Sequence, residues 1–275
     1  MDQITQLLEH FFKGKSVDTK RAYEADLMAF SEFMGMTSKE EAVSELLNLP
    51  ESQANLTVMY FRTKNRNTGL TVSSSNRKVS TLRSLVKLAK VRGLIDWNLQ
   101  IPNESNTYEK PKKEHNVNDI KKLFNTCRLQ NNKRKAVRDY AILRLLYDLI
   151  LKRNVISDLN IEDFNQSKNS IICNNSNHKA SKTKFLSTIT ARALKDWIKV
   201  RGNHEGALFI NFDAASKGKR LTSTSIYRLV TELSKRSDLF LTPDIVRQVA
   251  IKEALEKGKQ LGLDEQEIIQ LTDHK

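Results

Sequence analysis

The sequence contains little cysteine and no long apolar segment. Cys127 and Cys173 have no neighbouring cysteine partner, and the five histidines lack the spacing of metal ligands. We therefore expect two buried free thiols, no disulfide, no metal and no cofactor. No apolar run approaches the roughly 20 residues that cross a bilayer, and the chain opens with Asp2 and an amphipathic helix instead of a signal peptide. A globular cytoplasmic protein without a membrane partner is the expectation.

Acidic residues are absent from a long part of the N-terminal region. None occurs between Glu51 and Asp96, where nine basic residues accumulate: Arg62, Lys64, Arg66, Arg77, Lys78, Arg83, Lys87, Lys90 and Arg92. In a chain with a net charge of +14, this stretch favours a surface that faces phosphate groups, because each carboxylate there would repel a polyanion. A solvated basic face without a partner is the weaker alternative.

The spacing of apolar residues predicts five helices in the N-terminal part. They cover residues 4–14, 16–35, 38–49, 51–64 and 71–93. Leu56, Met59 and Tyr60 are expected to face inward from the fourth helix, and Leu82, Leu85, Val86 and Ala89 from the fifth. Residues 94–116 lose this periodicity and contain two prolines, which indicates an interdomain linker.

Residues 138–164 organise the second part. Ala141, Leu145, Leu146 and Leu149 recur on one helical face, and the charged pair Lys152 and Arg153 then interrupts the apolar run. The pattern predicts two packed helices with both cations at the corner between them. A corner is a place where side chains can reach a ligand.

The remaining sequence predicts a small sheet between helices. Residues 170–173 and 185–189 are rich in β-forming residues and are joined by a polar, lysine-bearing turn, so we expect a hairpin or a three-stranded sheet. Helices are predicted at residues 190–200 and 222–236. In the last helix Thr242 is the expected cap, Pro243 the first residue, and Asp244 and Arg247 lie one turn apart on the same face. The fold class expected is mainly α.

Five motifs together give the chain a resemblance to a known family. They are residues 16–27 followed by Phe30 and Phe33, residues 76–83, residues 138–143, residues 241–247, and Asp273 with His274. In this order and spacing the chain resembles the tyrosine recombinase, or phage integrase, family over nearly its whole length. The resemblance implies a SAM-like helical core-binding domain over residues 1–100, a linker over 101–115 and a mostly helical catalytic-type domain over 116–275 with a small antiparallel sheet. It also implies that the two domains form a C-shaped clamp on double-stranded DNA.

The resemblance also implies a catalytic site, of which this chain keeps only part. The family uses a tyrosine nucleophile, two arginines, a lysine and histidines for phosphoryl transfer. The first arginine falls on Lys152, which lacks the planar bidentate fork, and the first motif histidine falls on Asp244, which repels phosphate. The acidic residue that usually follows the first arginine falls on Val155. Arg247 and His274 keep their type.

Two further members of the family's catalytic set are unassigned or missing. A gap-free count places the hairpin lysine near Ser176 or Asn177, so that Lys179, Lys182 or Lys184 requires a shift, and Lys179 is taken as the family position. The tyrosine would follow His274 by about two turns of chain, and the sequence ends at Lys275.

The resemblance and the charge pattern together predict the DNA contacts. These are Thr19, Arg21, Asn76, Arg77, Lys78, Arg83, Lys179, Lys182 and Arg247. The favoured hypothesis is an inactive DNA-binding protein with an accessory or regulatory role. The alternative is a C-terminally truncated site-specific recombinase that acts in DNA integration. A helical scaffold with incidental charge is a third reading, and self-association or pairing with another recombinase is open in each.

Overall fold

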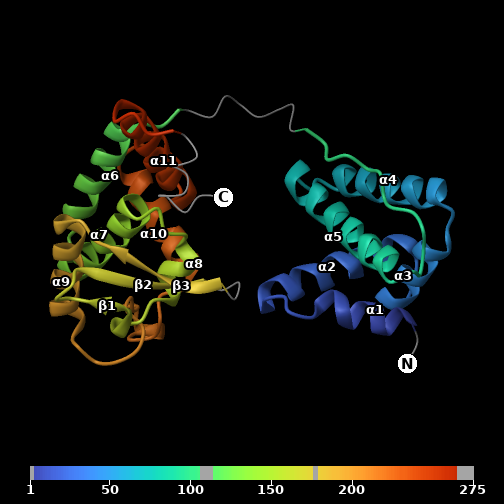
Figure 1. The fold of residues 1–275 in the computed structure, drawn as a ribbon, viewed down its shortest axis with the longest axis horizontal. Coiled ribbons are helices and arrows are strands. Elements are labelled where there is room, and N and C mark those ends of the chain that lie inside the picture. The colour runs from blue at the N-terminus through green and yellow to red at the C-terminus, as the bar shows by residue number, and fades with distance from the viewer. Residues whose placement is uncertain (1–2, 106–113, 176–178, 265–275) are drawn as a thin grey trace. The chain divides into compact units, whose positions relative to one another are not determined.

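The computed structural model describes residues 3–105, 114–175 and 179–264 and divides into two compact units, Met1–Lys112 and Lys113–Lys275 (Figure 1). Each unit has a hydrophobic core of its own. The units are therefore described one at a time.

The first unit is a bundle of five helices, as the apolar spacing predicts. These are α1 (Gln3–Phe12), α2 (Val17–Met34), α3 (Lys39–Asn48), α4 (Glu51–Asn67) and α5 (Val72–Val91). Ser16, Ser38 and Thr71 are the N-caps of α2, α3 and α5, and each accepts a backbone hydrogen bond in the first turn. Gly35 ends α2 in the left-handed conformation that glycine adopts without a steric penalty.

The inward face predicted for α4 is wrong. Leu56 is 50% exposed, and Met59 and Tyr60 are exposed too, whereas Val58 and Phe61 are buried. Phe61 packs against two phenylalanines of α2, and these aromatic contacts fix the rotation of the helix. Apolar residues occur on both faces of α4, so spacing alone could not distinguish them.

Part of the segment expected to be a linker packs on the first unit. Leu99 and Ile101 are buried in its core. The side-chain amide of Asn76 accepts a hydrogen bond from the backbone N–H of Glu104 at 3.0 Å and donates one to its carbonyl at 2.9 Å. The chain is thus fastened to this unit as far as Glu104, and residues 106–113 lie outside the described ranges.

The second unit surrounds one central helix. Its helices are α6 (Val117–Arg128), α7 (Lys133–Asp148), α8 (Arg153–Asp158), the 3-10 turn η1 (Ile161–Asp163), α9 (Thr188–Arg201), the 3-10 turn η2 (Ala214–Ser216), α10 (Ser223–Arg236) and α11 (Pro243–Gln260). Helix α7 packs against α6, α8, α9, α10 and α11. The predicted break between two helices, α7 and α8, is confirmed.

The sheet of the second unit is small and antiparallel, with the order β1–β2–β3 (Figure 1). Its strands are β1 (Phe164–Asn165), β2 (Ser170–Asn175) and β3 (Lys179–Phe185). The prediction of a strand at residues 170–173 is confirmed, but that of a strand at 185–189 is wrong, because β3 ends at Phe185 and α9 begins at Thr188. Ser187 accepts a hydrogen bond from the backbone of Thr190 at 3.2 Å, and this cap overrides the β-forming composition.

Both cysteines are buried and neither is in a disulfide, as expected. Burial raises the pKa of the Cys127 thiol to about 12. Among the described residues no cluster of histidine, cysteine and carboxylate side chains has the arrangement of a metal site. In those same ranges no helix is both long and apolar enough to span a bilayer.

Candidate functional site

A strained corner joins α7 to α8. Ile150 has a φ of +54°, a left-handed conformation that is a clear outlier for a β-branched side chain. Such a residue costs on the order of 1–3 kcal/mol and persists only where its surroundings hold it. Here Leu151, the next residue, is buried and donates its backbone N–H to the carbonyl of Leu145 at 3.2 Å.

Arg247 of α11 supports this corner from outside. Its Nε donates a hydrogen bond to the carbonyl of Ile150 at 2.9 Å, and its side chain is 11% exposed. Thr242 caps α11 and Pro243 is its first residue, as predicted, which sets Arg247 in the second turn. The structure therefore brings Arg247 next to the corner that carries Lys152, although the two lie 95 residues apart in the sequence.

Asp244 lies on the open side of Arg247. Its carboxylate is 66% exposed and lies 3.5 Å from a terminal nitrogen of the Arg247 guanidinium. The first turn of a helix favours a negative charge, because the helix dipole is positive there. The position thus suits a carboxylate structurally, but it places a negative charge where a phosphate would approach Arg247.

The two cations at the corner, Lys152 and Arg153, have different surroundings. Lys152 is exposed and is the N-cap residue of α8. Arg153 is half-buried, and its guanidinium lies over the ring of Tyr227 at 5.2 Å from the ring centre. The guanidinium of Arg153 is therefore engaged on α10 and does not substitute at the Lys152 position.

The lysines of β3 lie opposite buried residues of β2. Lys182 pairs with Cys173 and Lys184 with Ile171 in the antiparallel register, and residues directly opposite each other share one face of a sheet. That face contributes Ile171 to the core that also contains Ile156 of α8, and α8 packs against β2. Lys182 and Lys184 thus occupy the side of the sheet that faces α8. The side chain of Lys179, and all of His274, lie outside the described residues.

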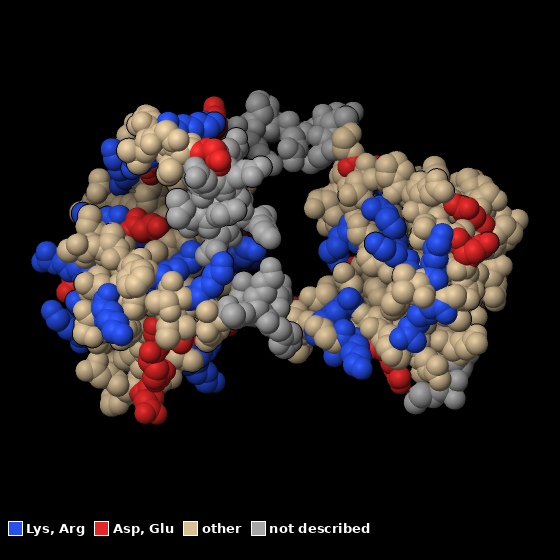
Figure 2. Space-filling view, in the orientation of Figure 1, with Lys and Arg blue, Asp and Glu red and all other residues tan. Residues whose placement is uncertain are grey.

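Basic side chains form patches on the surface of each unit (Figure 2). In the first unit, several of the nine basic residues predicted to face phosphate have intramolecular partners. Arg62 and Arg66 lie 3.2 and 3.5 Å from the carboxylate of Glu104. Arg83 donates to the carbonyl of Ile101 at 2.7 Å and to the side chain of Asn103 at 3.0 Å. These three arginines help to hold the segment that ends at Glu104.

Arg77 and Lys78 gather around one buried carboxylate. Asp26 of α2 is 1% exposed and lies 2.5 Å from a guanidinium nitrogen of Arg77 and 3.7 Å from the ammonium of Lys78. Thr81 donates a hydrogen bond to the same carboxylate at 2.8 Å. Sequence reasoning missed Asp26, although its spacing from Tyr23 and Phe30 on the apolar face of α2 indicates a buried charge, which requires a partner.

The two predicted contacts on α2 lie near its N-terminus. Arg21 is exposed, and Thr19 lies in the first turn, where its hydroxyl is 2.8 Å from that of Ser16. Arg77 also donates to the carbonyl of Ala22 at 3.4 Å. Arg77 therefore lies against the helix that carries Thr19 and Arg21, whereas Asn76 and Arg83 contact the segment that ends at Glu104.

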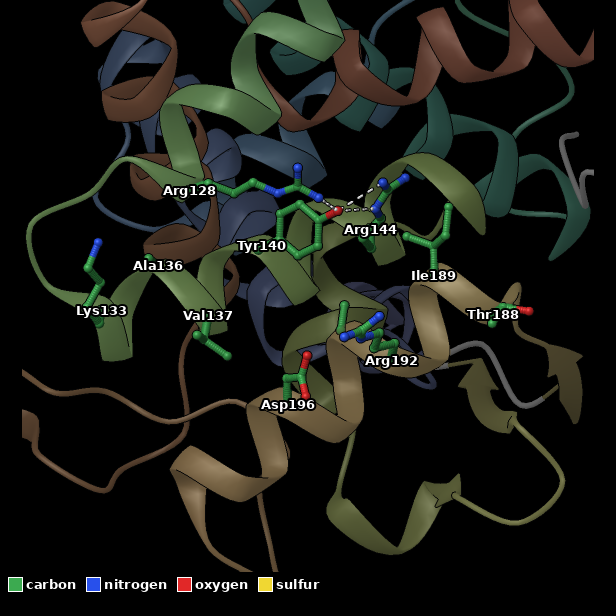
Figure 3. Close-up of a pocket in the computed structure, with 11 residues that line it drawn as sticks. Arg128, Lys133, Ala136, Val137, Tyr140, Arg144, Thr188, Ile189, Arg192 and Asp196 are labelled. Atoms are coloured by element: carbon green, nitrogen blue, oxygen red, sulfur yellow. Dashed lines mark hydrogen bonds between the residues drawn. The ribbon is translucent and has the colours of Figure 1, made fainter.

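A groove of about 560 Å³ lies between the C-terminal end of α6, α7 and α9 (Figure 3). Its wall includes Arg128 and Arg144, which both donate hydrogen bonds to the hydroxyl of Tyr140, and the exposed side chains of Ile189 and Arg192. Neither the corner at Ile150 nor Arg247 lines it. Among the predicted catalytic positions that the structure describes, Lys152, Asp244 and Arg247 do not line this groove.

Comparison with known sequences gives one consistent result. A sequence profile of the phage integrase family matches residues 114–275. A tyrosine recombinase of Synechococcus elongatus is 28% identical over 93% of this chain and 80% of its own length. A second, from Synechocystis, is 26% identical over 91% of this chain and 82% of its own length. The likeness thus extends over both units.

Comparison with solved structures agrees with the sequence comparison at the level of fold. The Tn1549 transposon integrase, solved in complex with transposon right end DNA, has a TM-score of 0.73 over 98% of this chain and 91% of that chain, at 14% identity. A lambda integrase dimer bound to a COC′ core site has a TM-score of 0.66 over 98% of this chain and 94% of that chain, at 13% identity. The mainly helical fold with a small antiparallel sheet is the fold of these enzymes.

Proposed function

The chain belongs to the phage integrase family, and from this membership we propose that it binds duplex DNA without cleaving it, in an accessory or regulatory role. The observation that carries DNA binding is the acid-free stretch between Glu51 and Asp96, together with its exposed cations on α5. A protein that neutralises phosphates releases condensed counterions, so its affinity falls steeply with salt. Solved relatives bound to DNA support the same reading.

Two side chains support the loss of cleavage. Lys152 occupies the position of the family's first arginine, and a lysine is a point charge that cannot hold two phosphate oxygens in a planar fork. Asp244 occupies the position of the first motif histidine, and its exposed carboxylate lies 3.5 Å from the guanidinium of Arg247. A phosphate at Arg247 would meet this negative charge where the family supplies a proton donor.

The residues that keep the family's type suit the binding of a phosphate better than the cleavage of DNA. Arg247 uses its Nε on the carbonyl of Ile150, which keeps the corner and α11 together. The ammonium of Lys152 and the lysines on the α8 side of the sheet add positive charge around this corner. We propose that the corner contacts the DNA backbone and that the first unit contributes the contacts of Thr19, Arg21, Arg77 and Lys78.

The test combines binding and chemistry on one substrate. A labelled nicked duplex is titrated with the protein over a range of salt concentrations, and the products are then denatured. We expect salt-sensitive binding, no covalent adduct, and a shallower salt slope for the variant Arg21→Ala, Arg77→Ala, by roughly 0.9 for each lost phosphate contact. If the parent protein does not bind, DNA recognition is refuted. A denaturant-resistant adduct would instead favour the alternative, a site-specific recombinase.

A further inference from the structure

A buried carboxylate lies beneath the proposed DNA surface of the first unit. Asp26 is on α2, and the groups that neutralise it come from α5, namely Arg77, Lys78 and Thr81. Burying a carboxylate is costly unless it is paired and hydrogen-bonded. The two cations exceed the one carboxylate by one positive charge, so the cluster remains attractive to an anion.

The geometry leaves one edge of Arg77 free. The Nη1 atom of its guanidinium takes both inward contacts, to Asp26 and to the carbonyl of Ala22, and no other hydrogen bond of this side chain occurs within the described residues. The side chain is 48% exposed. Its Nε and Nη2 therefore remain as donors, and two parallel N–H groups of a guanidinium match two oxygens of a phosphate.

Lys78 contacts Asp26 in a different way from Arg77. Its side chain is only 13% exposed, and its ammonium lies 3.7 Å from the second oxygen of Asp26, which lacks a hydrogen bond. Thr81 fixes the other oxygen with a hydrogen bond of 2.8 Å. Asp26 thus has contacts on both oxygens, and its orientation is set by α5.

We propose that Asp26 is the positioning residue of a phosphate clamp between α2 and α5, in which it holds Arg77 so that the Nε–Nη2 edge receives a DNA phosphate. This inference rests on the proposed DNA binding. It makes Asp26, a negatively charged residue, a requirement for binding a polyanion. Electrostatics alone predicts the reverse, because removal of a negative charge near the surface strengthens the attraction to phosphate.

The proposal and simple electrostatics predict opposite changes in DNA affinity when Asp26 loses its charge, and this difference gives a direct test. Asp26→Asn keeps the shape of the side chain and removes its charge. We expect it to bind duplex DNA roughly five- to tenfold more weakly, the loss expected when a charge-assisted phosphate contact is misplaced. Its salt slope should fall by up to about 0.9, because one phosphate contact is lost.

Glu24→Gln is the matched control, because it removes the same charge from the same helix at an exposed position. We expect equal or slightly stronger binding and an unchanged salt slope. If the parent protein binds duplex DNA and both neutral variants bind as tightly as it does, the clamp is refuted while DNA binding stands. If the parent does not bind at all, the proposed function itself is refuted.

The same substitution in an Arg77→Ala protein distinguishes a positioning role of Asp26 from a merely structural one. In an Arg77→Ala protein, Asp26 has no guanidinium to orient, so the further change Asp26→Asn should leave affinity unchanged or raise it. An equal loss in both backgrounds would show that Asp26 acts only through the fold, and would overturn the proposal. Thr81→Val provides the same test if Asp26→Asn does not fold, since it frees the carboxylate without altering charge and should weaken binding in the parent background only.

Discussion

Two arginines, one in each unit, are held next to a carboxylate in opposite ways. The partner of Arg77 is Asp26, which is buried beneath it, whereas the partner of Arg247 is Asp244, which is exposed beside it. The first carboxylate leaves an outward edge of its arginine available, and the second is exposed beside its arginine, where it would repel an anion. The position of a carboxylate therefore decides whether it presents a cation or competes for it.

The two arginines also differ in what they hold. Arg77 is 48% exposed and its inward contacts use one nitrogen, while Arg247 is 11% exposed and supports the carbonyl of the strained residue Ile150. The first is placed as a surface contact and the second as a structural support. Replacement of Arg77 should therefore lower the affinity for an anion, whereas replacement of Arg247 should mainly lower stability.

The largest effect is expected for Arg247→Ala. The change removes a charge-assisted hydrogen bond from a corner that a left-handed Ile150 already strains, so the free energy of unfolding should fall by about 1.5–3 kcal/mol. Any phosphate contact of Arg247 is lost too. Urea unfolding provides the measurement, with Lys152→Ala as the control, because this exposed lysine lies at the same corner without a side-chain cap hydrogen bond and a much smaller change is expected. Equal destabilisation of both variants would show that Arg247 does not support the corner.

Two smaller effects of opposite sign are expected for Asp244→Asn, one on DNA affinity and one on stability. Loss of the exposed carboxylate removes repulsion beside Arg247, so DNA affinity should rise a few-fold, by about 0.5–1 kcal/mol. The same change removes a favourable charge from the first turn of α11 and should lower stability by about 0.3–1 kcal/mol. Binding titrations and thermal unfolding are run on the same protein. Weaker binding would mean that Asp244 assists Arg247, as Asp26 is proposed to assist Arg77.

The smallest effect is expected for Ile150→Asn. Asparagine tolerates the left-handed conformation that a β-branched residue resists, but it also loses apolar packing, so the variant should be more stable by less than about 0.5 kcal/mol. DNA affinity should stay within about twofold, because the carbonyl that Arg247 contacts is retained. A lower melting temperature would show that packing of the Ile150 side chain outweighs its strain.

The sequence predicts best those helices whose ends are marked by capping residues. Ser16 and Gly35 mark both ends of α2, and Thr242 with Pro243 marks the start of α11, because caps act within a few residues. The corner at Lys152 was predictable for a similar reason, since a charged pair interrupts a buried stripe. The approach of Arg247 to that corner came from the family resemblance, because no local pattern relates residues so far apart.

The errors arise where tertiary contacts decide between local alternatives. Phe61 could be recognised as the inward residue of α4 only through the phenylalanines it meets on α2. The end of β3 depends on Ser187, whose cap competes with a β-forming sequence. The intramolecular partners of Arg62 and Arg66 depend on Glu104, which the loss of apolar periodicity assigns to a separate linker.

The position of α7 limits how the corner at its end can vary. Five helices contact α7, so a displacement of its C-terminus would have to be shared by several packed interfaces at once. A substitution at Lys152 should therefore change the side chain that is offered to a ligand without moving the backbone of the corner. In such a scaffold, the chemistry of one position can vary while the geometry around it is kept.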